Sequence, residues 1–185
     1  MYQEDIYLGY RYFDTFRKLV LYPFGYGMSY TSFTILPKEM KQEKEEVKFI
    51  TEVTNSGNYA GKETIQLYLS CSGTESEKPE KELKGFAKTR LLAPGEKQNI
   101  SIRISMQDLA GYVETSASYI LEKGKYQFFI GNSSRETIFA GEIQIREDYV
   151  IKKCVNRLCV QNCNVEHLQL SLIHISEPTR HLRIS

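Results

Sequence analysis

The sequence contains no tryptophan, and only one of its four cysteines, Cys71, lies within the first 150 of its 185 residues. A buried tryptophan packed against an intersheet disulfide is a hallmark of antibody-type immunoglobulin domains. A core of that kind is therefore excluded for this chain.

No charge of one sign dominates the chain, because 24 Lys and Arg residues are balanced by 23 Asp and Glu residues. A near-neutral balance leaves no electrostatic footprint for nucleic acid. No uninterrupted apolar run approaches the roughly 20 residues that a membrane helix needs. The opening MYQEDIYLGYRYF lacks the basic start and the apolar stretch of a signal peptide. We predict no nucleic-acid partner and no membrane partner, and the sequence leaves the localisation open.

Candidate metal ligands gather near the end of the sequence, where the spacing is C-x4-C-x3-C-x3-H over Cys154, Cys159, Cys163 and His167. On a helix the last three of these would share one face, and a Cys3His zinc site is conceivable. The spacing lacks the tight C-x2-C pair of the common zinc patterns. We therefore favour free thiols, and we predict neither a metal nor a cofactor.

Alternating runs of apolar and polar residues are what the sequence does contain, between residues 34 and 146. Such alternation has a period of two and is typical of half-buried strands, and turn pairs such as Pro94-Gly95 separate the runs. Weak helical character is confined to residues 38–46. The predicted core-facing residues are Val47, Phe49, Thr51 and Val53, then Ile65, Leu67 and Leu69, then Ile100, Ile102 and Ile104, and finally Tyr126, Phe128 and Ile130. About seven short strands predict an all-β fold, an immunoglobulin-like or fibronectin type III-like β-sandwich.

Residues 1–33 have a different texture, with eleven Tyr and Phe residues among frequent glycines. A segment of this length is too short to bury so many rings by itself. We therefore expect these rings to pack on the sandwich or on a part of the protein outside this chain.

Residues 147–185 lose the alternation, and we predict an unstructured tail there. Within it, the run LSLIHISEPTR at Leu170–Arg180 is the translation of a DNA string that resembles a transposase adapter used for sequencing libraries. We therefore set residues 170–185 aside as adapter-derived, as one would an expression scar.

Several segments, in order along the chain, resemble glycoside hydrolase family 3, the β-glucosidase and β-xylosidase group. They are YQEDIYLGYRYFDT, LYPFGYGMSYTSF, VTNSGNYAGKETIQLYLS, EKPEKELKGFAKTRLLAPGEKQNISI and GKYQFFIGNSS. Asp5 and Met28 stand where the family usually has Gly and Leu. Several ordered matches are more specific than one short motif.

The resemblance implies an order of parts: a (β/α)8 barrel, an α/β sandwich and a fibronectin type III-like domain. Residues 1–33 would be the end of the α/β sandwich domain plus a linker, and residues 34–146 the fibronectin type III-like domain. The family's nucleophile and acid/base lie upstream of these segments, so the resemblance implies no catalytic, cofactor-binding or metal residue here. The implied partners are the missing N-terminal catalytic domains of the same enzyme, and the implied substrate of the parent is a β-linked oligosaccharide.

Two groups of residues allow both a functional and a structural interpretation. Tyr10, Arg11, Tyr12 and Asp14 could lie near a sugar-binding cleft, but we favour packing between the second and third domains. Tyr22, Phe24, Tyr26 and Tyr30 could form a carbohydrate platform, but we favour a rigid, ring-packed linker. Glu4 and Asp5 are adjacent, and neighbours in a strand point to opposite faces, so a shared catalytic pair is not expected.

The sequence therefore predicts a non-catalytic structural domain that braces the catalytic domains of a β-glucosidase-like hydrolase. A free-standing carbohydrate-binding module and a cell-surface adhesion sandwich are the alternatives, because a fold does not fix a function. The YRYFD and PFGYG segments favour the first interpretation, since an adhesion domain has no reason to carry the end of an α/β hydrolase domain.

Overall fold

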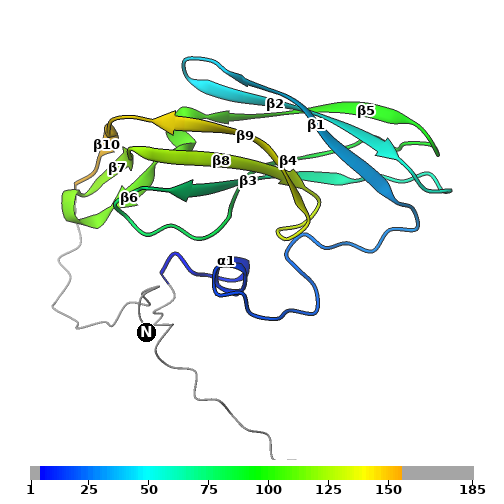
Figure 1. Cartoon of the computed structure of the whole chain (residues 1–185), viewed down its shortest axis with the longest axis horizontal. Helices are drawn as coiled ribbons and strands as arrows, with labels where there is room; N and C mark the ends of the chain where they lie inside the picture. Colours follow the sequence, from blue (N-terminus) through cyan, green and yellow to red (C-terminus); the bar gives the residue numbers. More distant parts are fainter. Residues whose placement is uncertain (1–4, 156–185) are drawn as a thin grey trace, which may run out of the picture.

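The computed structural model describes residues 5–155, and these residues form a β-sandwich with a short helix beside it (Figure 1). The helix is α1 (Tyr10–Thr15). The strands are β1 (Phe33–Gln42), β2 (Glu46–Asn55), β3 (Thr64–Ser72), β4 (Glu82–Lys88), β5 (Lys97–Ser105), β6 (Gly111–Val113), β7 (Ser118–Leu121), β8 (Gly124–Gly131), β9 (Thr137–Ile145) and β10 (Tyr149–Lys153). Short 3-10 turns at Met106–Leu109 and Glu114–Ser116 flank β6.

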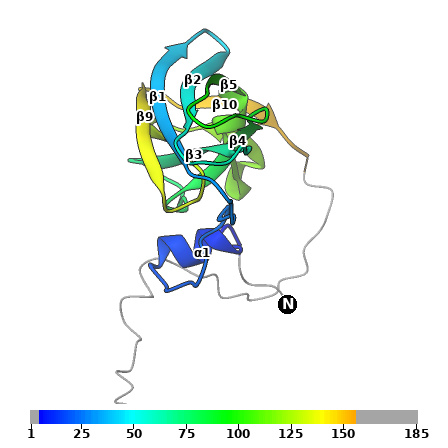
Figure 2. The ribbon, with the colours of Figure 1, turned by 90° about the vertical axis from the view of Figure 1, so that its right-hand side faces the viewer.

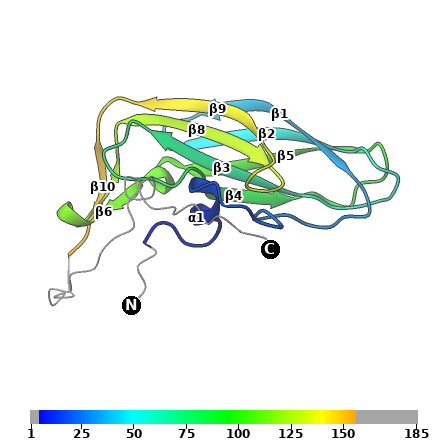
Figure 3. The same ribbon diagram turned by 60° about the horizontal axis from the view of Figure 1, so that its bottom comes forward.

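Two main sheets make the sandwich, one with the order β1-β2-β5 and the other with the order β4-β3-β8-β9. Together they hold the seven strands that the sequence predicts, and their strand pairs are antiparallel. A third, smaller sheet with the order β10-β7-β6 lies at one end of the sandwich (Figures 1 and 3). The predicted all-β sandwich class is confirmed, with this small sheet as an addition.

The core lies between the two main sheets and is filled by alternate residues of each strand. Val47, Phe49 and Val53 of β2 meet Leu67 of β3 and Phe128 of β8 in one buried cluster. The rings of Phe49 and Phe128 are 4.9 Å apart. The predicted core-facing residues are all buried, because period-two patterning places one face of each strand against the opposite sheet. Burial of a Leu, Ile or Phe side chain contributes about 1.5–3 kcal/mol each.

The weak helical character of the sequence at residues 38–46 does not lead to a helix. This stretch forms the end of β1, the hairpin turn and the first residue of β2. Its charged side chains are mostly exposed. The solvated strand edge that charge runs commonly form is thus what the chain adopts there.

The prediction of an unstructured tail from residue 147 is wrong for residues 149–153, which form β10 and pair with β7. All five side chains of β10 are exposed. The strand is defined by backbone pairing and buries no face, so it leaves no alternation for the sequence to reveal. The predicted adapter-derived residues 170–185 lie outside the described residues.

Residues 5–32 precede the sandwich and form a separate layer with α1 (Figure 2). The first strand begins at Phe33, one residue before the predicted domain start. The origin of residues 1–33 as the end of an α/β domain remains a prediction.

Candidate interdomain interface

The N-terminal layer lies on the outer face of the β4-β3-β8-β9 sheet. In β3 the core-facing residues alternate with Gln66 and Tyr68, which are also buried although they point to the other side. The ring of Tyr10 in α1 meets the Tyr68 ring edge-on at 6.2 Å and stacks on Phe24 at 4.4 Å. The amide of Leu83 donates a hydrogen bond to the Tyr10 hydroxyl at 2.8 Å. These contacts cover β3 on both faces, with the core on one side and the N-terminal layer on the other.

The PFGYG segment runs close to this face, and Gly25 is the residue that permits the approach. An ideal Cβ at position 25 would lie 2.3 Å from Nε2 of Gln66, and Gly25 has a φ of +84°. Only glycine adopts that backbone without strain and leaves that space free. The Ser134 amide donates to the carbonyl oxygen of Phe24 at 2.8 Å, so the residue before Gly25 is hydrogen-bonded to the sandwich.

Ion pairs also join the N-terminal layer to the sandwich, along the boundary between the two that we call the seam. Arg11 in α1 lies 3.0 Å from the Glu82 carboxylate of β4. The Arg135 guanidinium, in the β8–β9 turn, donates to Oδ1 of Asp14 at 2.7 Å and to the carbonyl oxygen of Lys18 at 2.7 Å. Arg135 therefore bridges the helix and the residues that follow it, and bonds of this kind to an ionised group are among the stronger ones in proteins.

A polar hollow of about 270 Å³ opens at this seam between α1 and the β8–β9 turn; its lining is Asp14, Arg17, Glu80, Lys81, Ser134 and Arg135. The ammonium of Lys81 donates to the carbonyl oxygen of Ser134 at 3.1 Å and to Oγ1 of Thr137 at 2.8 Å, and lies 5.3 Å above the ring centre of Phe129. Burial lowers the pKa of Lys81, because a low-dielectric setting disfavours the charged form.

The connection between β3 and β4, residues 73–81, contacts both the N-terminal layer and the sandwich. On one side lies Tyr7, a residue that is 2% exposed, and its hydroxyl donates to Oε2 of Glu77 at 3.1 Å. Burial, together with this bond to Glu77, raises the pKa of Tyr7. The amide of Glu80 donates to Oγ1 of Thr15 at 3.0 Å.

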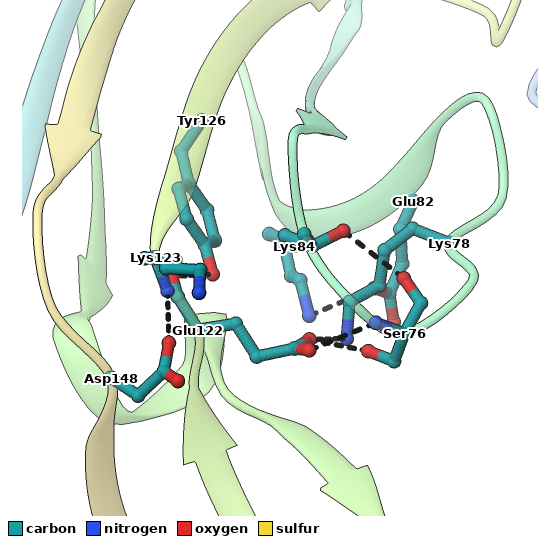
Figure 4. A network of polar contacts seen from close by, with 9 residues as sticks. Ser76, Lys78, Glu82, Lys84, Glu122, Lys123, Tyr126 and Asp148 are labelled. Atoms are coloured by element: carbon teal, nitrogen blue, oxygen red, sulfur yellow. Dashed lines mark hydrogen bonds and ion pairs between the residues drawn. The ribbon is translucent and has the colours of Figure 1, made fainter.

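On its other side this connection meets Glu122, which follows β7 (Figure 4). The Glu122 carboxylate accepts from the Ser76 amide at 2.9 Å and from the Ser76 hydroxyl, and lies 3.0 Å from Nζ of Lys78. Burial by itself would raise the pKa of Glu122, but the bonds from Ser76 and Lys78 outweigh it and hold that pKa below its ordinary value. The backbone near Glu122 is also bonded, since its carbonyl oxygen accepts from the Tyr126 hydroxyl at 2.9 Å.

The predicted interface residues Tyr10, Arg11 and Asp14 all contact the sandwich directly. Tyr12 packs instead on rings of its own segment, with its centroid 4.9 Å from that of Phe16. The structure brings these residues together as packing groups on the sandwich, with Arg11 and Asp14 in ion pairs.

The four rings for which we favoured a ring-packed linker over a carbohydrate platform lie in different surroundings. Phe24 stacks on Tyr10, Tyr22 and Tyr26 pair with each other at 5.0 Å, and Tyr30 is 97% exposed. The described contacts thus do not join them into one flat carbohydrate platform.

Sequence reasoning missed Glu77, Lys78, Arg135 and Glu122. Glu122 directly follows the apolar pair Ile120-Leu121 and precedes a lysine and a glycine, so it resembles an ordinary turn carboxylate. Its burial depends on the loop that crosses over it, and the sequence carries no local signal of that crossing.

Among residues 5–155, no cluster of three or more His, Cys, Asp or Glu side chains is placed to hold a metal ion. The conceivable zinc ligands Cys159, Cys163 and His167, as well as Glu4 of the adjacent carboxylates, lie outside the described residues. Over the same described range, no helix has both the length and the apolar character to cross a membrane.

Comparison with known proteins places these features in a wider group. A family model described as a fibronectin type III-like domain matches residues 63–134. Beta-glucosidase A of Butyrivibrio fibrisolvens is 38% identical over 180 residues, an alignment that covers 85% of this chain and 22% of that protein.

Solved structures agree with the sequence comparison. A β-glucosidase from Paenibacillus barengoltzii matches with a TM-score of 0.80 and 39% identity, over 84% of this chain and 18% of that one. The β-glucosidase 3B of Thermotoga neapolitana, solved with α-D-glucose, matches with a TM-score of 0.76 and 38% identity, over 82% of this chain and 21% of that one. The chain thus spans about a fifth of the length of the relatives that it matches.

Proposed function

Because this chain belongs to the fibronectin type III-like part of the family 3 glycoside hydrolases, we propose that it serves as a non-catalytic brace for the catalytic domains of a β-glucosidase. The reaction of the whole enzyme would be hydrolysis of β-linked glycosides, with an oligosaccharide as substrate. The partner of this chain would be the remaining domains of that enzyme, and this chain itself would supply no catalytic carboxylate.

The observation that carries this proposal is that residues 5–32 are packed on the sandwich in one part and expose large apolar side chains in another. One side, through Tyr10, Arg11 and Asp14, is fixed on the sandwich. Further along the same segment, Leu19, Leu21 and Met28 are each more than 90% exposed. Large apolar side chains that lie bare beside a well-packed seam are typical of a surface that another domain covers.

Bracing contributes to catalysis through alignment. Retaining glycosidases hold two carboxyl groups about 5 Å apart across the scissile bond, and a misplacement of about 1 Å far from the chemistry can cost about 100-fold in rate. A domain that is packed rigidly against its neighbours keeps such a pair in register without contacting the substrate.

A chimera tests the proposal most directly. The matching segment of the Paenibacillus barengoltzii β-glucosidase is replaced by residues 5–155 of this chain, and release of nitrophenol from an aryl β-glucoside is measured. We expect the chimera to retain activity that the same enzyme loses when the segment is deleted. A folded chimera no more active than the deletion would contradict the proposal.

The chain by itself provides the complementary test. Purified full-length chain should release no nitrophenol from aryl β-glucoside or β-xyloside, and it should not bind a glycan array. Activity that follows the chain through purification would reveal a catalytic pair in it, and specific glycan binding would favour a carbohydrate-binding module instead.

A further inference from the structure

Residues 73–81 link the N-terminal layer to the sandwich, and the side chains that they use alternate in direction. Glu77 bonds Tyr7 of the N-terminal layer, whereas its two neighbours, Ser76 and Lys78, bond Glu122 of the sandwich. Neighbouring side chains of an extended chain point to opposite sides. Pro79 follows Lys78 and restricts it to an extended backbone. A hold on Ser76 and Lys78 therefore sets the direction of Glu77.

Glu122 is built into this position. Its side chain is 7% exposed and that of Lys78 is 18% exposed, so the pair is largely shielded from water. Gly111 of β6 leaves room for the lysine, since an ideal Cβ at that position would lie 2.2 Å from Nζ of Lys78. The carboxylate thus meets an ammonium, an amide and a hydroxyl from residues 76–78, as Figure 4 shows.

We propose that Glu122 is a positioning residue: it fixes residues 73–81 and, through Glu77 and Glu80, holds residues 7–15 of the N-terminal layer on the sandwich. Its relevance to catalysis rests on the proposed function, in which that layer connects to the catalytic domains. The contacts from Glu122 through residues 76–80 to the N-terminal layer are observed in this chain and do not depend on that function.

Amide hydrogen exchange of the full chain tests the chain of contacts. In Glu122→Ala, we expect peptides that cover residues 7–15 and 73–81 to exchange about 10-fold faster or more, while the amides of β2, β3 and β8 keep their wild-type protection. Glu122→Gln retains an acceptor for the Ser76 amide and should fall between wild type and Glu122→Ala, as partial rescue.

Tyr7→Phe tests whether the effect runs from Glu122 through residues 76–78 to residues 7–15 and not in the reverse direction. It removes the hydroxyl that reaches Glu77 but keeps the ring, so it should loosen residues 7–15 and leave Ser76 and Lys78 protected. The matched control is Glu142→Gln, which removes an exposed ion pair between Glu142 of β9 and Lys125 of β8 and should change neither region.

The proposal is overturned if residues 7–15 keep their protection in Glu122→Gln and Glu122→Ala, or if every amide of the sandwich speeds up equally. It is also overturned if Tyr7→Phe loosens residues 76–78 as much as Glu122→Ala does. Should Glu122→Ala not fold, the Gln and Phe variants decide alone. Because exchange is measured on this chain without catalytic domains, its result is independent of the chimera.

Discussion

Asn55 is a buried amide at the end of β2 whose side chain ties three separate segments together. Its Nδ2 donates to the carbonyl oxygens of Tyr59 at 2.7 Å and Leu92 at 2.9 Å, and its Oδ1 accepts from the Gly57 amide and the Thr31 hydroxyl. Both donors and both acceptor positions of the amide are thus used. Asn55, the last residue of β2, thus joins Thr31 of the N-terminal layer to the connection between β2 and β3 and to Leu92.

Asn55→Ala should therefore destabilise the fold by about 2 kcal/mol, because the carbonyl oxygen of buried Leu92 loses its donor and three part-buried hydrogen bonds are lost with it. For a chain of this size that corresponds to a melting temperature lower by roughly 4–8 °C, measured by circular dichroism. Asn58→Ala, at an exposed position three residues on, is the control and should shift it little. Equal melting temperatures for the two variants would rule out this role of Asn55.

Glu122 also gives a pH prediction at the residue scale. The pKa of this carboxyl is held below its ordinary value in the folded chain, so the ionised form stabilises the native state. That contribution is complete above the ordinary carboxyl pKa of about 4.3 and disappears as the pH falls through the lower folded value. The melting temperature of wild type should exceed that of Glu122→Gln at pH 7, and the gap should close below about pH 4. A gap that stays constant from pH 7 to pH 3 would show that the charge on Glu122 is not what stabilises the fold.

At the scale of elements, β10 is a strand of backbone pairing without a buried face. It pairs with β7 over residues 149–153, and the amide of Cys154 donates to the carbonyl oxygen of Ala117 at 2.7 Å. Because all five of its side chains are exposed, little hydrophobic free energy depends on it. A chain that ends at Asp148 should melt within about 2 °C of the full chain, yet β7 amides should exchange faster. A drop of several degrees would mean that the segment after residue 148 stabilises the core.

At the scale of the whole molecule, exposed apolar side chains in the segment between α1 and β1 predict self-association. Leu19, Leu21 and Tyr30 are each more than 90% exposed, and exposed apolar surface favours association. The full chain should form oligomers with rising concentration in light scattering. The triple variant Leu19→Ser, Leu21→Ser and Tyr30→Ser should remain monomeric with an unchanged melting temperature. If the two proteins are equally monodisperse, this surface does not drive association.

This test keeps residues 5–32 in place for a structural reason. Removal of the segment would uncover Tyr68 and Gln66, which the N-terminal layer buries on the outer face of the sheet. A shortened chain would therefore exchange one exposed apolar surface for another.

Strand β3 shows which buried residues the sequence pattern can predict and which it cannot. The alternation Ile65, Leu67, Leu69 correctly predicted the face that meets the opposite sheet. Tyr68, on the other face, is just as buried, and alternation has no means of showing that both faces of a strand are covered. The cover comes from Tyr10, 58 positions away in the chain.

The sequence by itself determined the sandwich class, the core-facing residues and the family resemblance, because period-two burial and short motifs are written locally along the chain. Tertiary structure alone decided the seam. Asp14 and Arg135 are 121 positions apart, and Ser76 and Glu122 are 46 apart. Pairs of that kind depend on which strands become neighbours and on which loop crosses which strand. Such distant groups meet only once the strands have paired in their final order, because the entropy cost of closing the long loops between them is met by the packing of the whole sandwich. No single stretch of sequence therefore encodes these pairs.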